Sequence, residues 1–358
     1  MSISWSIVYG TPVNGPRCGR YQSTYCTNPL NLQVSVSACI VNNKYLYLII
    51  MRLPNRKPAR FFILTVTITI LLATCATQRM VYYPDAAAPG NTPLLFAQKV
   101  ISLPGRFEQN ITFSANGREY YYGTTDKEDW WYRSILRTRV LKNGTIVTDT
   151  PDIIKNFAFV KDRFIGEPFL SPDGSELFFV AGFQPDIWMS KRKRDGNWNT
   201  PALLDGPVNT KAGEWNPSLS KQGTLYFAST RTDSGRLYKA ARVQGSYPNV
   251  EMLKGPINAD DAGDPCIAAD ESFIVFSSWK KGGFGGTDLY VSALQKDGTW
   301  SMPVNLGAGI NTAEDEVGPR ISPDGKYLFF HRRDKWQHAT ASDIYWVNMA
   351  VVSKHLKP

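Results

Sequence analysis

Short apolar runs separated by tight turns recur along most of this chain. The two best copies are Glu167–Phe179 (EPFLSPDGSELFF) and Gly318–Phe330 (GPRISPDGKYLFF). In both, an apolar stretch leads into Ser-Pro-Asp-Gly and an aromatic stretch follows. Pro fixes φ at the first central position of a turn, and Gly accepts a positive φ. The pattern therefore predicts two antiparallel strands joined by a hairpin.

Three looser copies bring the number of repeats to five. The copies align on Ile111, Pro168, Pro217, Pro265 and Pro319, which lie 48 to 57 residues apart. After the hairpin, Asp186, Asp288 and Asp343 each open a third apolar strand, and a fourth short strand follows in most copies. Four strands in about 50 residues are typical of one blade of a β-propeller. The sequence thus predicts an all-β, five-bladed β-propeller of four-stranded antiparallel blades.

These motifs also resemble a known repeat. The Ser-Pro-Asp-Gly hairpins, the Asp-Ile-Tyr strand at Asp343 and the Trp-x-x-Pro segments at Trp198 and Trp300 are similar to the WD40-like, TolB-type propeller repeat of bacterial cell-envelope proteins. The resemblance covers about residues 93–352. It implies a propeller in the envelope that serves as a scaffold or binding protein; a few members of such families are enzymes.

The two ends of the repeat region complement each other. Pro93–Ile101 has the pattern of a fourth strand without the three that should precede it, and the last copy stops after its third strand at Asp343–Val347. We expect the N-terminal strand to complete the last blade, because this pairing removes two open sheet edges.

The positive charge of the chain is concentrated at its start. The net charge is +9, but residues 1–75 contain seven Lys or Arg residues and no acid, so the remainder has a net charge of only +2. A nearly neutral propeller gives no support for nucleic-acid binding.

Residues 51–75 have the pattern of a signal peptide. A basic stretch from Met51 to Arg60 precedes an apolar run from Phe61 to Leu72, and Leu72-Ala-Thr-Cys75 resembles a lipobox. The run is short for a permanent membrane span, which favours a cleaved signal and a lipid anchor on Cys75. An uncleaved anchor or a simple secretory signal is the alternative. Residues 76–92, rich in Pro and Ala, then read as a flexible tether.

Residues 1–50 lie upstream of this complete signal. They hold three Cys and no acid. We interpret them as an upstream translation artefact or a disordered segment, with translation starting at Met51. Only Cys75 and Cys266 then remain in the mature part, so no disulfide framework is expected. Residues 353–358 form a short basic tail after the propeller.

Acidic residues recur just before the inner strand of each blade. The candidates for a ligand-binding ring at the channel mouth are Glu108, Glu167, Glu214, Asp264 and Glu316. Such a ring could bind a cation, a sugar or a basic peptide. The alternative is that each acid accepts hydrogen bonds from its own loop.

Other candidate sites are weaker. His331 and His338 are expected at the surface and not as metal ligands, because no Cys or carboxylate cluster lies near them in the sequence. No metal or cofactor is predicted. Trp198 and Trp300 occupy matching repeat positions, which favours packing between blades. The chain contains no Gly-x-Ser-x-Gly elbow, so a serine hydrolase is disfavoured.

Together these observations favour a non-catalytic, lipid-anchored envelope protein. It would be a monomeric propeller that faces the periplasm or the exterior and binds a protein or glycan partner. The alternative is a carbohydrate-active enzyme, a glycoside hydrolase or lyase, that uses carboxylates at the channel mouth.

The lipid anchor can be tested by detergent partitioning. We expect the mature protein to enter the detergent phase and the Cys75→Ser variant to remain in the aqueous phase, because acylation requires the thiol of Cys75. Cys266→Ser is the control and should partition like the parent. Identical partitioning of Cys75→Ser and the parent would rule out lipidation at this residue.

Overall fold

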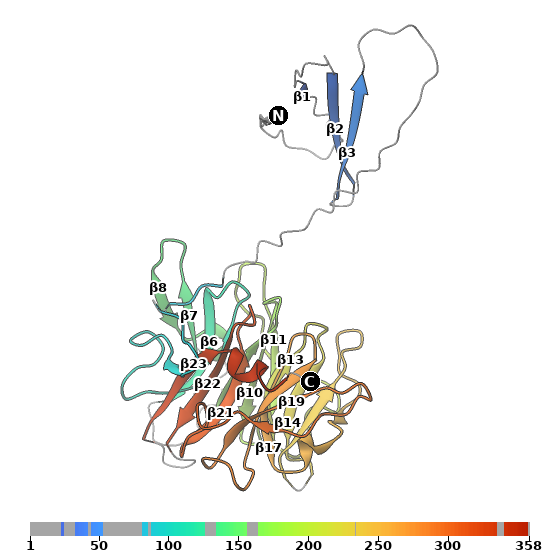
Figure 1. Cartoon of the computed structure of the whole chain (residues 1–358). Helices are drawn as coiled ribbons and strands as arrows, with labels where there is room; N and C mark the ends of the chain where they lie inside the picture. Colours follow the sequence, from blue (N-terminus) through green and yellow to red (C-terminus); the bar gives the residue numbers. More distant parts are fainter. Residues whose placement is uncertain are drawn as a thin grey trace. The chain divides into compact units, whose positions relative to one another are not determined.

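The computed structural model describes residues 23–24, 33–41, 44–52, 81–84, 87–125, 134–155, 164–232, 234–334 and 340–356. The chain divides into two compact units, Met1–Leu72 and Ala73–Pro358 (Figure 1). In the first unit, β1 (Ser23–Thr24), β2 (Gln33–Val41) and β3 (Lys44–Arg52) form an antiparallel sheet in the order β1-β2-β3. Strand β3 runs past Met51, the start expected for the signal. Translation from Met51 stays a prediction, and Cys75 and the lipobox lie outside the described residues.

The second unit contains five four-stranded antiparallel sheets, which confirms the prediction of a five-bladed β-propeller. Blade 1 comprises β5 (Phe107–Phe113), β6 (Glu119–Thr125), β7 (Ser134–Val140) and β8 (Ile146–Asp149). Blade 2 comprises β9 (Phe164–Leu170), β10 (Glu176–Gly182), β11 (Asp186–Lys191) and β12 (Ala202–Leu203). Blade 3 comprises β13 (Glu214–Leu219), β14 (Leu225–Ser229), β15 (Arg236–Ala240) and β16 (Glu251–Met252).

Blade 4 comprises β17 (Ala262–Ile267), β18 (Phe273–Ser278), β19 (Asp288–Ala293) and β20 (Val304–Asn305). Blade 5 comprises β21 (Asp315–Ile321), β22 (Tyr327–Arg333), β23 (Ser342–Asn348) and β4 (Leu94–Leu95). The described helical segments are short: α1 (Asp152–Lys155), α2 (Ala350–Ser353) and one 3₁₀ turn (Pro256–Asn258). Among the described residues, no helix is long and apolar enough to cross a membrane.

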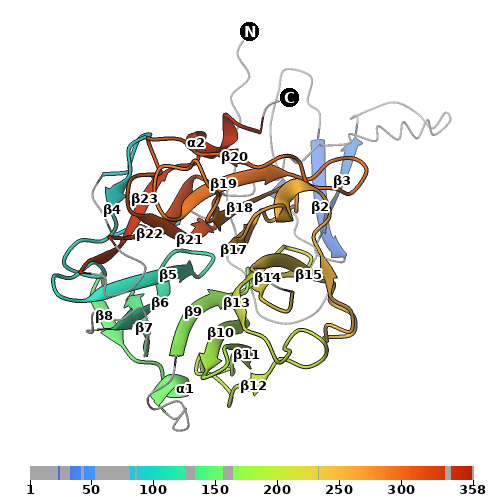
Figure 2. The same cartoon turned by 90° about the horizontal axis from the view of Figure 1, so that it is seen from below.

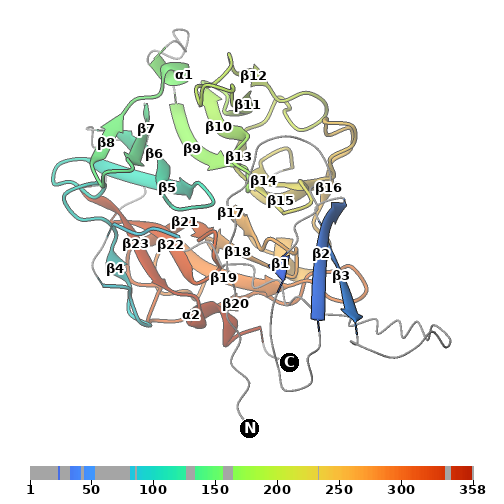
Figure 3. The same cartoon turned by 90° about the horizontal axis from the view of Figure 1, so that it is seen from above.

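The five sheets stand around a common axis, as Figures 2 and 3 show from opposite sides. Each of the inner strands β5, β9, β13, β17 and β21 contacts the inner strands of both neighbouring blades. The hydrophobic core of the described residues is correspondingly divided into five clusters, one between each pair of neighbouring blades. The propeller is thus held together by packing between sheets, and its inner strands face a narrow axis.

Strand β4 is the outermost strand of blade 5. Leu94 pairs with Trp346 and Leu95 pairs with Tyr345, although these residues lie far apart in the sequence. The strand is much shorter than the predicted Pro93–Ile101. Ala97 and Lys99 have φ angles of +49° and +68°, so the chain turns away from the sheet after two paired residues.

Three buried side chains agree with the sequence analysis. Trp198 and Trp300 are 7% and 2% exposed and belong to the clusters between blades 1 and 2 and between blades 3 and 4. Cys266 lies on β17 as a buried free thiol. The predicted packing role of the two Trp residues is therefore confirmed.

Candidate functional site

Each inner strand contains a β-bulge at the same repeat position. In all five sheets, the register between the first and second strands shifts so that two residues oppose one. The first residue of each bulge has a positive φ. These five residues, here called the bulge ring, are Asn110 (45°), Glu167 (51°), Asn216 (48°), Asp264 (51°) and Gly318 (61°). A positive φ is uncommon for residues other than Gly, so a feature shared by all five blades must serve the architecture or the site.

Asn216 joins several members of the bulge ring across the axis. Its backbone N–H donates to Oε2 of Glu167 at 2.6 Å, and its side-chain amide donates to Oδ1 of Asp264. Its amide oxygen accepts a hydrogen bond from the side chain of Asn110. A single residue thus contacts residues of three other blades.

Asp264 and Gly318 continue this network. Oδ2 of Asp264 accepts hydrogen bonds from Oγ of Ser277 at 2.6 Å and from the backbone N–H of Gly318 at 3.2 Å. A Cβ atom on Gly318 would lie 2.5 Å from the amide oxygen of Asn110 and 2.7 Å from Nδ1 of His331. The fifth ring position therefore accepts only glycine without a rearrangement of these groups.

Burial changes the protonation of Glu167. Loss of solvent, followed by the nearby charge of Asp264, raises the pKa of Glu167 to about 8, although a hydrogen bond from Asn216 and the charges of Arg320 and Arg333 oppose the shift. At neutral pH this carboxyl is therefore mostly protonated, and it can donate a hydrogen bond.

The bulge ring borders a cavity of about 570 Å³, here called the mouth cavity. Its walls combine aromatic rings with polar groups: Gln109, Phe164, Glu167, Trp215, Asn216, Asp261, Asp264, Trp279, His331 and Arg333. Trp279 is 40% exposed, so its ring is accessible from solvent. Nε2 of Gln109 and Nδ1 of His331 are buried and have no hydrogen-bond partner among the described residues.

His331 corrects one sequence-based prediction. It lies on β22 and is 3% exposed, so the expectation of a surface residue is wrong. Burial, together with the charges of Arg333 and Arg320, lowers its pKa well below 6.5, and the ring is neutral at physiological pH. His338 lies outside the described residues. Within the described part of the chain, no group of three His, Cys, Asp or Glu side chains could hold a metal ion.

Three of the five candidate acids occupy a different position, two residues before the bulge. Glu108, Glu214 and Glu316 have side chains with no exposed surface, and each pairs with an arginine: Arg106 at 2.6 Å, Arg231 at 3.2 Å and Arg332 at 2.6 Å. We call these three the latch acids. They do not line the mouth cavity, whereas Glu167 and Asp264 do.

The surroundings of the latch acids indicate a structural role. Glu214 also accepts hydrogen bonds from the backbone and hydroxyl of Thr210, and Glu316 accepts the same pair from Thr312. Burial raises the pKa of Glu316, and it raises the pKa of Glu108 to about 8. The five acids thus lie at two places on the inner strands, whereas the sequence analysis placed all five in one ring at the channel mouth.

The sequence analysis missed most of the mouth cavity. Asn110, Asn216, Trp215, Trp279 and His331 were not recognised as neighbours of Glu167 and Asp264. One signal was present in the sequence: four of the five bulge residues directly precede a Pro, and the latch acids lie two positions earlier. Sorting the five acids by their distance from this Pro would have separated Glu167 and Asp264 from the three latch acids.

Comparisons with known proteins concern the fold of the chain and not its candidate site. No protein-family model and no curated protein matches the chain. Among solved structures, it is similar to TolB from Acinetobacter baumannii, with 13% identity, a TM-score of 0.42 and coverage of 68% of this chain and 57% of that one. It is also similar to an α-L-arabinofuranosidase from Lactobacillus brevis, with 13% identity, a TM-score of 0.46 and coverage of 68% and 92%. The expected resemblance to TolB propellers is confirmed at this level.

The raised pKa of Glu167 predicts a pH dependence of stability. Its pKa rises from 4.5 to about 8 on folding, so the folded state binds more protons between these values. The free energy of unfolding should therefore fall as the pH rises through this window, by up to about 1.4 kcal/mol per pH unit. The side chain of Glu167→Gln cannot ionise, so the free energy of unfolding of this variant should fall less steeply with pH than that of the parent. Urea denaturation at pH 5, 6.5 and 8 measures both slopes. Glu108, whose pKa is also about 8, accounts for part of the slope that remains in the variant.

Asp195→Asn is the control for this experiment. Hydrogen bonds from Asn197 lower the pKa of Asp195 below 3.8. The contribution of Asp195 to the free energy of unfolding is therefore lost only below pH 3.8, outside the range from pH 4.5 to 8 in which Glu167 acts. An equal pH slope in Glu167→Gln and the parent would contradict the assigned protonation of Glu167.

Proposed function

We propose that this protein is a non-catalytic binding module whose mouth cavity holds the end of a glycan. The observation that carries the proposal is the combination of aromatic faces and hydrogen-bonding groups in one cavity of about 570 Å³. Ligand pockets typically combine apolar walls with a few well-placed polar groups that orient the ligand.

The cavity suits the two kinds of surface that a sugar ring presents. The C–H groups of a sugar pack on aromatic rings, and Trp279 offers such a ring at the solvent boundary. Sugar hydroxyls require donors and acceptors. The half-exposed Asp261 provides acceptors, and the hydroxyl groups of Thr230 and Ser234 in the lining can donate as well as accept.

The hydrogen bonds of Asp264 favour binding over catalysis. Asn216 occupies one of its oxygens, and Ser277 and Gly318 occupy the other. A carboxylate held in this way orients neighbours more readily than it attacks a substrate.

One observation favours the second candidate, a glycoside hydrolase. Glu167 is mostly protonated at neutral pH and lies close enough to Asp264 to feel its charge. A protonated acid beside a second carboxylate is the pairing that glycoside hydrolysis requires. Release of 4-nitrophenol from 4-nitrophenyl glycosides by the parent, but not by Glu167→Gln, would replace the binding function with this one.

The cellular setting of the proposal rests on the N-terminal sequence. The basic and apolar segments before Cys75 and the tether after it support a lipid-anchored protein of the bacterial envelope, facing the periplasm or the exterior. In that setting, a monomeric propeller would present its mouth cavity to an envelope glycan, or to a protein that carries one.

The proposal is tested by titration calorimetry with three trisaccharides: chitotriose, xylotriose and arabinotriose. We expect at least one of them to bind the parent, and we expect Trp279→Ala to weaken that binding about tenfold, because the aromatic wall is removed. Phe183→Ala is the matched control, since Phe183 is 78% exposed and lies outside the cavity lining. No binding of any trisaccharide at millimolar concentration, or equal losses in both variants, would contradict the proposal.

A further inference from the structure

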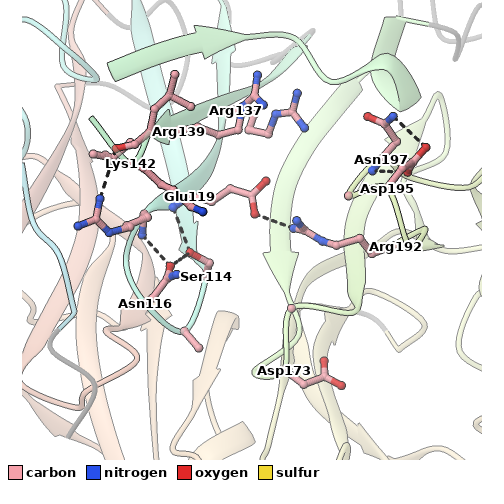
Figure 4. Close-up of a pocket in the computed structure, with 16 residues that line it drawn as sticks. Ser114, Asn116, Glu119, Arg137, Arg139, Lys142, Asp173, Arg192, Asp195 and Asn197 are labelled. Atoms are coloured by element: carbon pink, nitrogen blue, oxygen red, sulfur yellow. Dashed lines mark hydrogen bonds and ion pairs between the residues drawn. The ribbon is translucent and has the colours of Figure 1, made fainter. Parts of the chain in front are cut away.

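A second cavity, of about 600 Å³, lies between blades 1 and 2 (Figure 4). It is bordered by the β5–β6, β7–β8 and β9–β10 turns and by the segment after β11. In antiparallel blades, these turns lie at the opposite end of the strands from the mouth cavity. The lining contains five cationic side chains: Arg118, Arg137, Arg139, Lys142 and Arg192. We call this cavity the basic pocket.

The propeller repeat accounts for only one of these cations. Arg192 donates to Glu119 of the preceding blade at 2.7 Å and lies over the ring of Trp198. Blades 2 and 3 are joined in the same way, because Arg242 donates to Glu176 at 2.6 Å and lies over Tyr247. Arg192 is therefore part of a link that recurs between blades.

The other cations have no such explanation. Arg137 on β7 lies opposite Tyr121 on β6. In blade 2 the corresponding pair is Met189 on β11 opposite Phe178 on β10. Blade packing at this position thus does not require a charge. Arg137 and Arg139 also share one carboxylate, that of Asp149, at 2.8 and 2.9 Å. Two guanidinium groups on one acid leave a positive charge unbalanced.

Lys142 and Arg118 add to this surplus. Within the described residues, neither forms an ion pair; Arg118 donates to the carbonyl of Leu141 and lies over the ring of Tyr82. Nε of Arg139 and Nε of Arg192 are buried without a hydrogen-bond partner in the described part of the chain. The guanidinium and ammonium groups of Arg118 and Lys142 can both donate hydrogen bonds to an anion.

The acids of the lining do not cancel this charge. Asp173 and Asp195 accept hydrogen bonds within their own turns, from Ser175 and Asn197. Glu119 is bound to Arg192 and Tyr121. Five cations thus stand against four acids, the three of the lining and Asp149, and each of these acids is held by other contacts. The two turn carboxylates, Asp173 and Asp195, are exposed at the rim.

We propose that the basic pocket binds a small phosphorylated saccharide. Guanidinium groups suit the several oxygens of a phosphate, and the four cations that blade 1 contributes suit a group with two negative charges better than a single carboxylate. The rim carboxylates can accept hydrogen bonds from sugar hydroxyls. The volume is sufficient for a monosaccharide phosphate.

The test uses glucose 6-phosphate as the probe in titration calorimetry, with glucose and inorganic phosphate for comparison. We expect glucose 6-phosphate to bind, glucose not to bind at this site and inorganic phosphate to bind more weakly. Arg139→Gln and Lys142→Gln should each weaken the binding of glucose 6-phosphate about tenfold, since each removes a charged contact.

Two control variants make the result specific to the basic pocket. Lys296→Gln removes a cation from the β19–β20 turn, the counterpart in blade 4 of the turn that carries Lys142, and should leave the affinity unchanged. Trp279→Ala alters the mouth cavity and should also have no effect, so the outcome is independent of the proposed function. Absence of glucose 6-phosphate binding, equal affinity for inorganic phosphate, or an equal loss in Lys296→Gln would overturn the proposal.

Discussion

The positive φ angle in each inner strand is the constraint on which the centre of this propeller depends. At each bulge, one extra residue enters the strand, and the backbone there turns toward the axis. Because all five blades do this at one repeat position, Asn110, Glu167, Asn216, Asp264 and Gly318 come together although they lie on different sheets. Consecutive members of the ring, 48 to 57 positions apart in the sequence, are thereby placed in one hydrogen-bond network.

The latch acids support this arrangement from outside the cavity. Each is fully buried beside an arginine, and removal of one partner of such a pair typically costs about 3–5 kcal/mol, less where the arginine is partly exposed. Their ion pairs hold the first residues of three inner strands, β5, β13 and β21, two positions before the bulge. A residue that stabilises the blades and one that borders the cavity are separated by only two positions, as Glu214 and Asn216 of β13 illustrate.

The sequence predicted the fold well because local patterns determine it. A tight turn between apolar strands recurs in each blade, as Ser-Pro-Asp-Gly in blades 2 and 5 and in looser form in the others, and packing at Trp198 and Trp300 followed from their matching positions. The site was harder to predict because a bulge changes which side chains face the axis, and the Pro that follows four of the five bulge residues does not by itself indicate a bulge. His331 illustrates this: its burial depends on Gly318 opposite, which has no side chain to fill the space. The basic pocket uses cations from two blades and is equally absent from any single motif.

The most direct test of the account compares the unfolding free energies of Asn216→Gly and Asn216→Ala. In an ordinary strand, Ala is the more stable of the two by about 0.5–1 kcal/mol, because Gly loses more freedom on folding. At a φ of +48° the order should reverse, since a Cβ atom is strained there by about 1 kcal/mol or more. Both variants should be less stable than the parent, because both lose the bridges to Asn110 and Asp264. An Asn216→Ala protein more stable than Asn216→Gly would contradict the central role of the bulge ring.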